Sequence, residues 1–420
     1  MDPAALLPNA LTWTFVAALA LATATRLWLA RRQMQHVAAH RAAVPAPFSD
    51  TIPLHDHQKA ADYTLAKARF GMLGVAVEAL LALGLTVGGG LQALSDLGAL
   101  WLAPGSLLHG TALLLSLFLV QGLVGLPLSA WRIFVIEQRF GFNRMTVRLF
   151  LADLVKQTLI GLALGVPLLL ALLWLMAQAG PAWWLYAWLV VVAFTVFVQM
   201  LVPTVILPLF NKFTPLPDGV LKEKVAALLA RTGFQSKGLF VMDGSKRSSH
   251  GNAFFAGFGR AKRIVLFDTL VTRLQPAEVE AVLAHELGHY KLRHILKGMA
   301  LTAAMTFAML FLLGVLLDKP WFYAGLGVRE PGTAAALALL MIVLPEFTYF
   351  LHPLLSMFSR KNEYEADAYA TRFAGRADLV NALVALYKDN AATLTPDPLH
   401  SAFYDSHPPA ALRIARLQRA

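Results

Sequence analysis

The chain has 420 residues, of which 57% are hydrophobic, 15% are charged and none is cysteine, and its formal net charge is +11. A soluble domain carries roughly a quarter charged residues, so this composition indicates an integral membrane protein. The lack of cysteine excludes disulfides and thiolate metal sites. The basic residues are spread over several loops, as lipid-facing positive charge would be, so we expect no nucleic-acid partner.

Seven apolar segments are long enough to cross a bilayer as helices of about 20 residues. They lie near residues 5–25, 71–92, 106–130, 157–177, 182–207, 298–317 and 333–357. We therefore predict a mainly α, polytopic membrane protein. Its parts are spans one to five (1–207), a polar block (208–297), spans six and seven (298–357) and a second polar block (358–420).

The distribution of positive charge predicts the orientation in the membrane. The first span opens on "MDPAALLPNA" without a basic region, and Arg26, Arg31 and Arg32 follow it. This order is typical of an uncleaved anchor with its N-terminus outside. The segments after spans two and four have no Lys or Arg, and the segment after span six has only Lys319 and Arg329. The positive-inside rule then puts both polar blocks and the C-terminus in the cytoplasm.

The stretch "EAVLAHELGHYKLRH" (280–294) combines His285 and His289, four residues apart, with Glu286. On a helix this spacing puts both imidazoles on one face, about a turn apart, as two zinc ligands require. "QPAEVE" predicts that the helix starts at Pro276. An HExxH pattern also arises by chance on amphipathic helices, so the metal interpretation needs a third ligand.

A third ligand is available in "SRKNEYEADAYATRF", which contains Glu363, Glu365 and Asp367. A zinc hydrolase keeps three protein ligands, and a ligating histidine usually donates its other N–H to a carboxylate. Glu363 and Asp367 share a helix face, so they are expected as the ligand and the orienting carboxylate, and Glu365 is the weaker candidate. The alternative is a solvated charged helix. Small residues around the acids favour close approach to another helix, and they are Ala366, Ala368 and Ala370.

The first polar block also predicts a small β-sheet. Turn residues alternate with β-prone runs at 238–242, 252–258 and 263–267. An exposed strand edge can bind an extended peptide through main-chain hydrogen bonds, which suits an endopeptidase.

Two acids, Glu78 and Glu346, fall inside predicted spans, and His352 lies near the inner end of the last span. A charge in mid-membrane costs at least ~2.5 kcal/mol if it faces lipid, so we expect these groups to face protein or water. The alternatives are a structural ion pair or a side chain that snorkels to the interface, and for His352 a purely structural role is an equal alternative.

Five motifs in order resemble the CAAX prenyl protease type I family of integral-membrane zinc metallopeptidases. They are "LPLFNKFTPLPDG", "SSHGNAFFAGFG", "HELGH", "SRKNEYEADAYA" and "SHPPAALRIARL". The resemblance covers essentially the whole chain. It implies a barrel of seven transmembrane helices around a large water-filled chamber, capped on the cytoplasmic side by the zinc domain.

The resemblance also implies roles for individual residues. It implies one zinc ion held by His285, His289 and Glu363, with Glu286 as general base. It implies a histidine near the oxyanion at His407. It implies contacts with substrate from Asn252 and Ala253 on an edge strand and from Arg413.

The substrate class stays open at this stage. Eukaryotic members of the family cleave the last three residues from farnesylated CAAX proteins. The Ala/Leu/Arg-rich composition indicates a bacterial chain, hence a multi-pass protein of the inner membrane. Protein prenylation is not general in bacteria, so the expected partners are prenylated or unprenylated peptide tails, or membrane proteins subject to quality control, besides the lipid bilayer.

Two other classes of protein share part of this pattern. Site-2-type intramembrane proteases also carry HExxH, and "TPLPDG" (214–219) faintly resembles their Asp-Gly motif. That motif should follow the histidines inside a span, whereas here it precedes them in a polar block. A zinc transporter or non-catalytic membrane scaffold is a different class, but a pure binding site has no use for Glu286.

Overall fold

A computed structural model describes residues 8–256 and 263–419. Seven of its helices are long and apolar enough to cross a membrane, which confirms the polytopic prediction. They are α1 (Ala10–Ala39), α2 (Leu54–Leu85), α4 (Leu107–Trp131) with its π-helical continuation η3 (Arg132–Glu137), α5 (Val147–Gln178), α6 (Trp183–Leu201) with η5 (Val202–Ile206) and α7 (Leu207–Phe210), α11 (His294–Leu316), and α13 (Thr333–Thr348), which continues through η7 (Tyr349–Leu351) into α14 (His352–Ala370). Residues 5–7 of the first predicted span lie outside the described residues.

Contacts between the membrane helices follow a closed ring. Going round the ring, contacts join α1 to α2, α2 to η3 at the end of α4, α4 to α5, α5 to α6, α6 to α11, α11 to α13, and α13 back to α1. In six of the seven spans, at most 22% of the apolar window is buried. A helix packed around a filled core would bury a whole face, so the ring encloses a hollow interior, as the resemblance implied.

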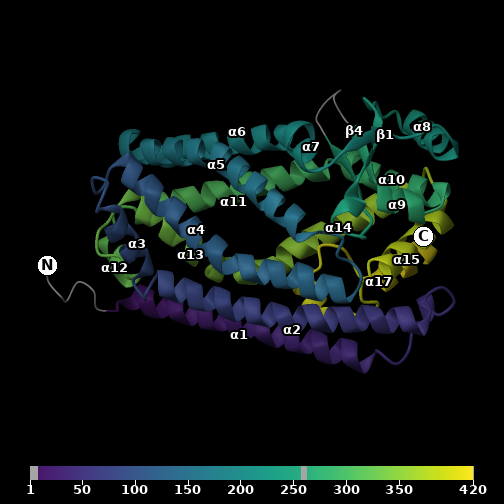
Figure 1. Cartoon of the computed structure of the whole chain (residues 1–420), viewed down its shortest axis with the longest axis horizontal. Coiled ribbons are helices and arrows are strands. Elements are labelled where there is room, and N and C mark those ends of the chain that lie inside the picture. Colours follow the sequence, from purple (N-terminus) through teal and green to yellow (C-terminus); the bar gives the residue numbers. More distant parts are fainter. Residues whose placement is uncertain (1–7, 257–262, 420) are drawn as a thin grey trace.

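Packed side chains close one end of this ring. Two short helices, α3 (Gly90–Gly98) and α12 (Pro320–Gly325), lie at that end, and a buried apolar cluster that includes Leu114, Tyr323 and Leu339 fills it. The sheet and the helices around it lie at the opposite end (Figure 1). Seven helices that could each cross the membrane lie between the start of α1 and the C-terminal helix α17 (Ala410–Arg419). Because seven is odd, these two ends of the chain would lie on opposite sides of the membrane.

The second span ends earlier than predicted. The sequence favoured 71–92, but α2 ends at Leu85 and a turn precedes α3. Gly89 takes φ +74°, a left-handed conformation that glycine adopts without steric cost. The apolar run continues through this turn, so hydropathy alone did not reveal the end of the helix.

The end opposite the packed cluster carries a four-stranded sheet in the order β1-β2-β4-β3. The strands are β1 (Phe213–Pro215), β2 (Leu239–Met242), β3 (Ala253–Ala256) and β4 (Arg263–Phe267). Strands β2 and β4 are parallel, the other pairs are antiparallel, and β3 is an edge strand. The three predicted runs correspond to β2, β3 and β4, while residues 257 and 258 lie outside the described residues. The edge strand β1 was not predicted, because Pro215 argues against a strand.

The polar segments add six helices at this end of the molecule; two of them contact the sheet, and the others pack on these two, on α14 or on one another. The six helices are α8 (Val220–Thr232), α9 (Asp268–Arg273), α10 (Pro276–Lys291), α15 (Arg376–Asp389), α16 (Pro398–Tyr404) and α17. Helix α10 begins at the predicted Pro276, and Gln275 N donates to the Glu278 carboxylate at 2.8 Å. Its apolar face, including Val279, Leu283 and Leu287, is fully buried against the sheet and α15.

Candidate metal centre

The centre depends on a close crossing of α10 and α14. A Cβ atom placed on Gly288 would lie 2.9 Å from Cα of Ala366 and 3.1 Å from its carbonyl oxygen. Only glycine therefore fits at this position of α10. Ala366 and Ala370 are fully buried, as the close-approach argument predicted, whereas Ala368 is exposed. The crossing brings Glu363 of α14 opposite the two histidines of α10.

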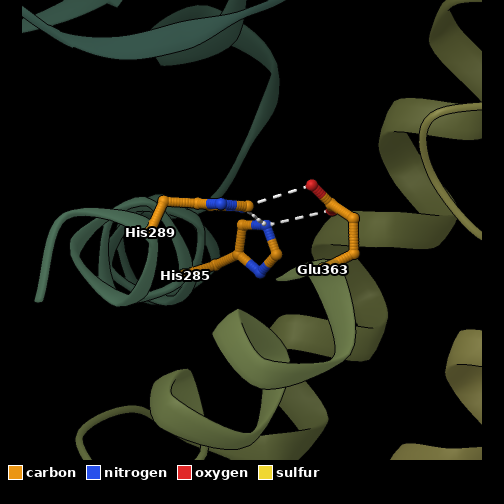
Figure 2. A group of neighbouring side chains, drawn as sticks. All are labelled: His285, His289 and Glu363. Carbon is orange, nitrogen blue, oxygen red and sulfur yellow. Dashed lines mark hydrogen bonds and ion pairs between the residues drawn. The ribbon is translucent and has the colours of Figure 1, made fainter. Parts of the chain in front are cut away.

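Figure 2 shows His285, His289 and Glu363 pointing toward one another from these two helices. Nε2 of His285 lies 3.2 Å from Nε2 of His289 and 3.4 Å from Oε2 of Glu363, and Nε2 of His289 lies 3.2 Å from Oε1 of Glu363. Ligand atoms of a tetrahedral zinc at its usual bond lengths are separated by about 3.3 Å. Each of these three contacts thus has the spacing of two corners of a tetrahedral site.

The Glu363 carboxylate indicates independently that a cation belongs there. Glu363 is 4% exposed, and its Oε2 has no hydrogen-bond partner among residues 8–256 and 263–419. A buried carboxylate oxygen is costly unless it is paired or bound to a metal. The residues present therefore fit a metal ion.

His285 is oriented by a second carboxylate, as predicted for Asp367. Asp367 Oδ1 lies 2.9 Å from His285 Nδ1, and Arg413 forms a bidentate ion pair with Asp367 at 2.6 and 2.9 Å. Burial lowers the pKa of His285, but hydrogen bonds with Asp367 and Glu363 outweigh it and raise the pKa to about 9. Arg413, expected to contact substrate, is 5% exposed, and its guanidinium also lies 3.5 Å from the Glu363 carboxylate.

His289 has a different partner, which the sequence reasoning missed. His294 Nδ1 lies 3.1 Å from His289 Nδ1, and His294 Nε2 lies 3.1 Å from Glu365 Oε2. His294 closes the stretch that contains HExxH, but spacing alone does not show that its ring turns back toward His289. Glu365 lies on a different face from Glu363 and is not one of the three grouped ligands, as expected for the weaker candidate.

Glu286 is half-buried beside His285 on α10. Burial raises the pKa of Glu286 above its usual range, although the nearby His285 and His289 act in the opposite direction. A carboxylate with a raised pKa takes up a proton more readily near neutral pH, which is the property that a general base needs.

His407 reaches the centre from the C-terminal segment. Its Nε2 lies 3.3 Å from Oε1 of Glu363, and its Nδ1 lies 2.9 Å from the Ser406 hydroxyl. Its side chain is exposed, unlike the ligands. Arg360 of α14 donates to the carbonyl oxygens of Ser401, Ala402 and Asp405, and this fixes the turn that leads to His407.

The predicted peptide-binding residues lie at the start of β3, which packs against α10. Phe267 N donates to Asn252 O at 3.0 Å across the β3–β4 pair. Since hydrogen-bonding directions alternate along an antiparallel strand, the Ala253 N–H points to the free edge. The Asn252 side-chain oxygen accepts from it at 2.8 Å.

The two intramembrane acids differ in burial, since Glu346 is buried and Glu78 is exposed, so the expectation that they avoid lipid is met by Glu346 and stays a prediction for Glu78. Glu346 is 8% exposed and pairs with Arg26 of α1 at 3.1 Å. Glu78 lines a cavity of about 500 Å³ between α2 and α4, together with Lys67 and Arg132. His352 is exposed at the start of α14, with its ring 5.8 Å from that of Tyr349.

A hollow ring of membrane helices that carries an HExxH helix, with a glutamate on a crossing helix, defines a membrane-embedded metallopeptidase. Residues 33–212 match the family described as CAAX prenyl protease N-terminal, five membrane helices, and residues 215–420 match Peptidase family M48. The chain belongs to the CAAX prenyl protease 1 family of M48 peptidases.

Known relatives support this assignment over most of their length. The CAAX prenyl protease 1 homolog of Oryza sativa subsp. japonica is 33% identical over 92% of both chains. CAAX prenyl protease 1 of Saccharomyces cerevisiae is 38% identical over 70% of this chain and 69% of its own. The crystal structure of S. mikatae Ste24p matches with a TM-score of 0.90 and 31% identity, covering 97% of this chain and 99% of that one.

Proposed function

We propose that the protein is a zinc endopeptidase that cleaves extended C-terminal tails. The observation that carries this proposal is that Nε2 of His285, Nε2 of His289 and the Glu363 carboxylate lie 3.2–3.4 Å from one another, while Oε2 of Glu363 accepts no hydrogen bond from the described residues. His285, His289 and Glu363 would hold one zinc ion per chain, and Asp367 and Arg413 would orient His285.

When bound, zinc supplies Lewis acidity toward the scissile carbonyl and makes water a nucleophile near neutral pH. Glu286 removes a proton from the attacking water and delivers it to the leaving amine. His407 donates a hydrogen bond to the oxygen that gains negative charge in the transition state. In this proposal Arg413 supports the ligand His285 through Asp367 and does not bind the substrate.

The free edge of β3 is the proposed binding site for the substrate backbone. A peptide that adds to β3 as an extra strand takes the Ala253 N–H from the Asn252 side chain, which is then free to bind the peptide itself. This exchange selects extended, unfolded tails over folded domains.

The proposed substrates are CAAX-type tails, prenylated or not, and membrane proteins under quality control. The relatives named CAAX prenyl protease 1 support the first class, and the hollow barrel supports both. The positive-inside pattern supports an orientation with the N-terminus outside and the C-terminus in the cytoplasm, and the Ala/Leu/Arg-rich composition is the basis for placing the protein in the inner (cell) membrane of a bacterium. A reporter fused at Ala420 should be active only in the cytoplasm, and activity only outside would reverse this orientation.

The test uses purified full-length protein in detergent. We expect zinc near one per chain and cleavage of an extended peptide, with mass spectrometry locating the bond in matched prenylated and unprenylated peptides. Glu286→Ala should keep its zinc and lose at least about two orders of magnitude in turnover. Bound zinc without any cleavage by the wild type would instead favour a transporter or scaffold, and a fully active Glu286→Ala variant would refute the mechanism.

A further inference from the structure

His294 and Glu365 have no part in the proposed chemistry, yet they form a continuous connection to a ligand. His294 is 6% exposed, and its two ring nitrogens lie 3.1 Å from His289 Nδ1 and 3.1 Å from Glu365 Oε2. Glu365 is partly exposed and lies 3.7 Å from Lys297 and 3.9 Å from Lys361. The connection therefore runs from the metal centre to the surface.

The backbone before His294 has an unusual conformation. Helix α10 ends at Lys291 and α11 begins at His294, and Arg293 between them has φ +58°. A non-glycine residue in the left-handed region costs of order 1 kcal/mol or more and persists where the surrounding structure imposes it. The left-handed residue separates the two helices, and the His294 ring at the start of α11 lies 3.1 Å from the His289 ring near the end of α10.

The ring nitrogens allow only one arrangement of protons if His289 binds a metal. His289 Nε2 faces Glu363 and His285, so it must carry the lone pair, and Nδ1 must then carry the hydrogen. His294 Nδ1 consequently accepts from His289, and His294 Nε2 carries a hydrogen that it donates to Glu365. The opposite order would put a hydrogen on His289 Nε2 and remove its lone pair.

On the basis of the proposed ligand set, we infer that His294 and Glu365 are positioning residues that fix the tautomer and orientation of His289. They do for His289 what Asp367 does for His285, with a neutral imidazole between ligand and carboxylate. Partners of this kind typically contribute about 10–100-fold in metal affinity.

Substitutions at His294 distinguish this role from a purely structural one, in which the His294–Glu365 contact only holds α11 against α14. His294→Asn puts an amide oxygen near the position of Nδ1, where it can accept from His289. His294→Gln puts an amide nitrogen near the position of Nε2, where it can donate to Glu365 but not accept from His289. We expect the zinc Kd to rise about 10–100-fold in His294→Ala and His294→Gln and to recover substantially in His294→Asn.

The readout is zinc affinity, measured by competition with a chelator on full-length protein in detergent, with thermal unfolding of the metal-free protein beside it. Lys361→Ala is the matched control, because Lys361 contacts Glu365 from the solvent side, and its Kd should stay within about twofold of wild type. A merely structural tie would give rescue by His294→Gln, or a loss of metal-free stability with an unchanged Kd in His294→Ala. Either result overturns the inference.

Failure of the inference is distinguishable from failure of the proposed function. If His289→Ala and Glu363→Ala bind zinc as tightly as wild type, the ligand set itself is wrong. If both lose zinc while His294→Ala retains wild-type affinity, only the positioning role is refuted.

Discussion

Two buried carboxylates near the junction of the membrane barrel and the sheet differ in how they are neutralised. Asp153 of α5 and Glu363 of α14 are each 4% exposed. Asp153 receives two hydrogen bonds from Arg247, at 2.7 and 2.9 Å, and Asn211 accepts from the same guanidinium at 2.8 Å. Glu363 instead has nitrogens of His289, His407, His285 and Arg413 at 3.2, 3.3, 3.4 and 3.5 Å. The first carboxylate is fully paired, and the second has room for a small cation.

This difference shows that a buried carboxylate can either stabilise the fold through an ion pair or provide a binding site for a cation. The Asp153–Arg247 pair joins a membrane helix to the segment between β2 and β3, and both oxygens of Asp153 accept a hydrogen bond from Arg247. The four nitrogens around Glu363 come from three separate parts of the chain, and their spacing leaves the carboxylate incompletely bonded. We expect substitutions in the two clusters to separate stability from chemistry.

The largest effect should come from Glu363→Ala. Removing this ligand should abolish zinc binding and lower peptide cleavage by at least about 10³-fold, since metal activation supplies several kcal/mol and each 1.36 kcal/mol is tenfold in rate. Metal analysis and turnover on the same preparation measure both quantities. Full zinc occupancy in Glu363→Ala, with loss of zinc in Glu365→Ala, would contradict the assignment.

Asp153→Ala should have the opposite consequence. It leaves the Arg247 guanidinium without its carboxylate, which costs about 3 kcal/mol of unfolding free energy, the low end for a broken buried pair because Arg247 is partly exposed. Zinc affinity of the folded protein should not change. Denaturant unfolding in micelles and chelator competition test the two parts, and the double change Asp153→Leu with Arg247→Met should restore much of the stability. Loss of zinc affinity without loss of stability would show that the two clusters are not independent.

The pH dependence of stability should differ between chelated and zinc-loaded protein. The pKa of His285 is raised to about 9 by Asp367 and Glu363, above an unfolded value of about 6.5. Its protonation therefore stabilises the metal-free protein fully below about pH 6.5, and this stabilisation is lost as the pH rises through about 9, by up to about 3 kcal/mol. Zinc requires the neutral imidazole, so the loaded protein should lack this decline. If the Tm of both forms changed in parallel between pH 6 and 9.5, protonation of His285 would not contribute to the stability of the metal-free protein.

The sequence predicted the features that depend on helical periodicity. The i, i+4 spacing is sufficient to place His285 with His289, and Glu363 with Asp367, on shared helix faces without any tertiary contact. It could not predict that His294 faces His289, because this depends on the single left-handed residue Arg293. It also missed the end of α2, because the apolar run continues through the glycine turn. The position of Arg413 depends on how α17 packs, which no local pattern encodes.

The smallest expected effect concerns the crossing that brings Glu363 to the histidines. Gly288→Ala puts a methyl group 2.9 Å from backbone Cα of Ala366, which a rigid helix can relieve only by moving away. Overpacking of this kind costs about 1–3 kcal/mol, and separation of α10 from α14 should weaken zinc binding as well. Gly298→Ala in α11 is the matched control, because its added Cβ meets nothing within 4 Å. In a helix interior that change should instead stabilise the protein by about 0.5–1 kcal/mol. Thermal unfolding and chelator competition on the two variants give the comparison. Equal stability and equal zinc affinity would mean that the close crossing of α10 and α14 is not what assembles the centre.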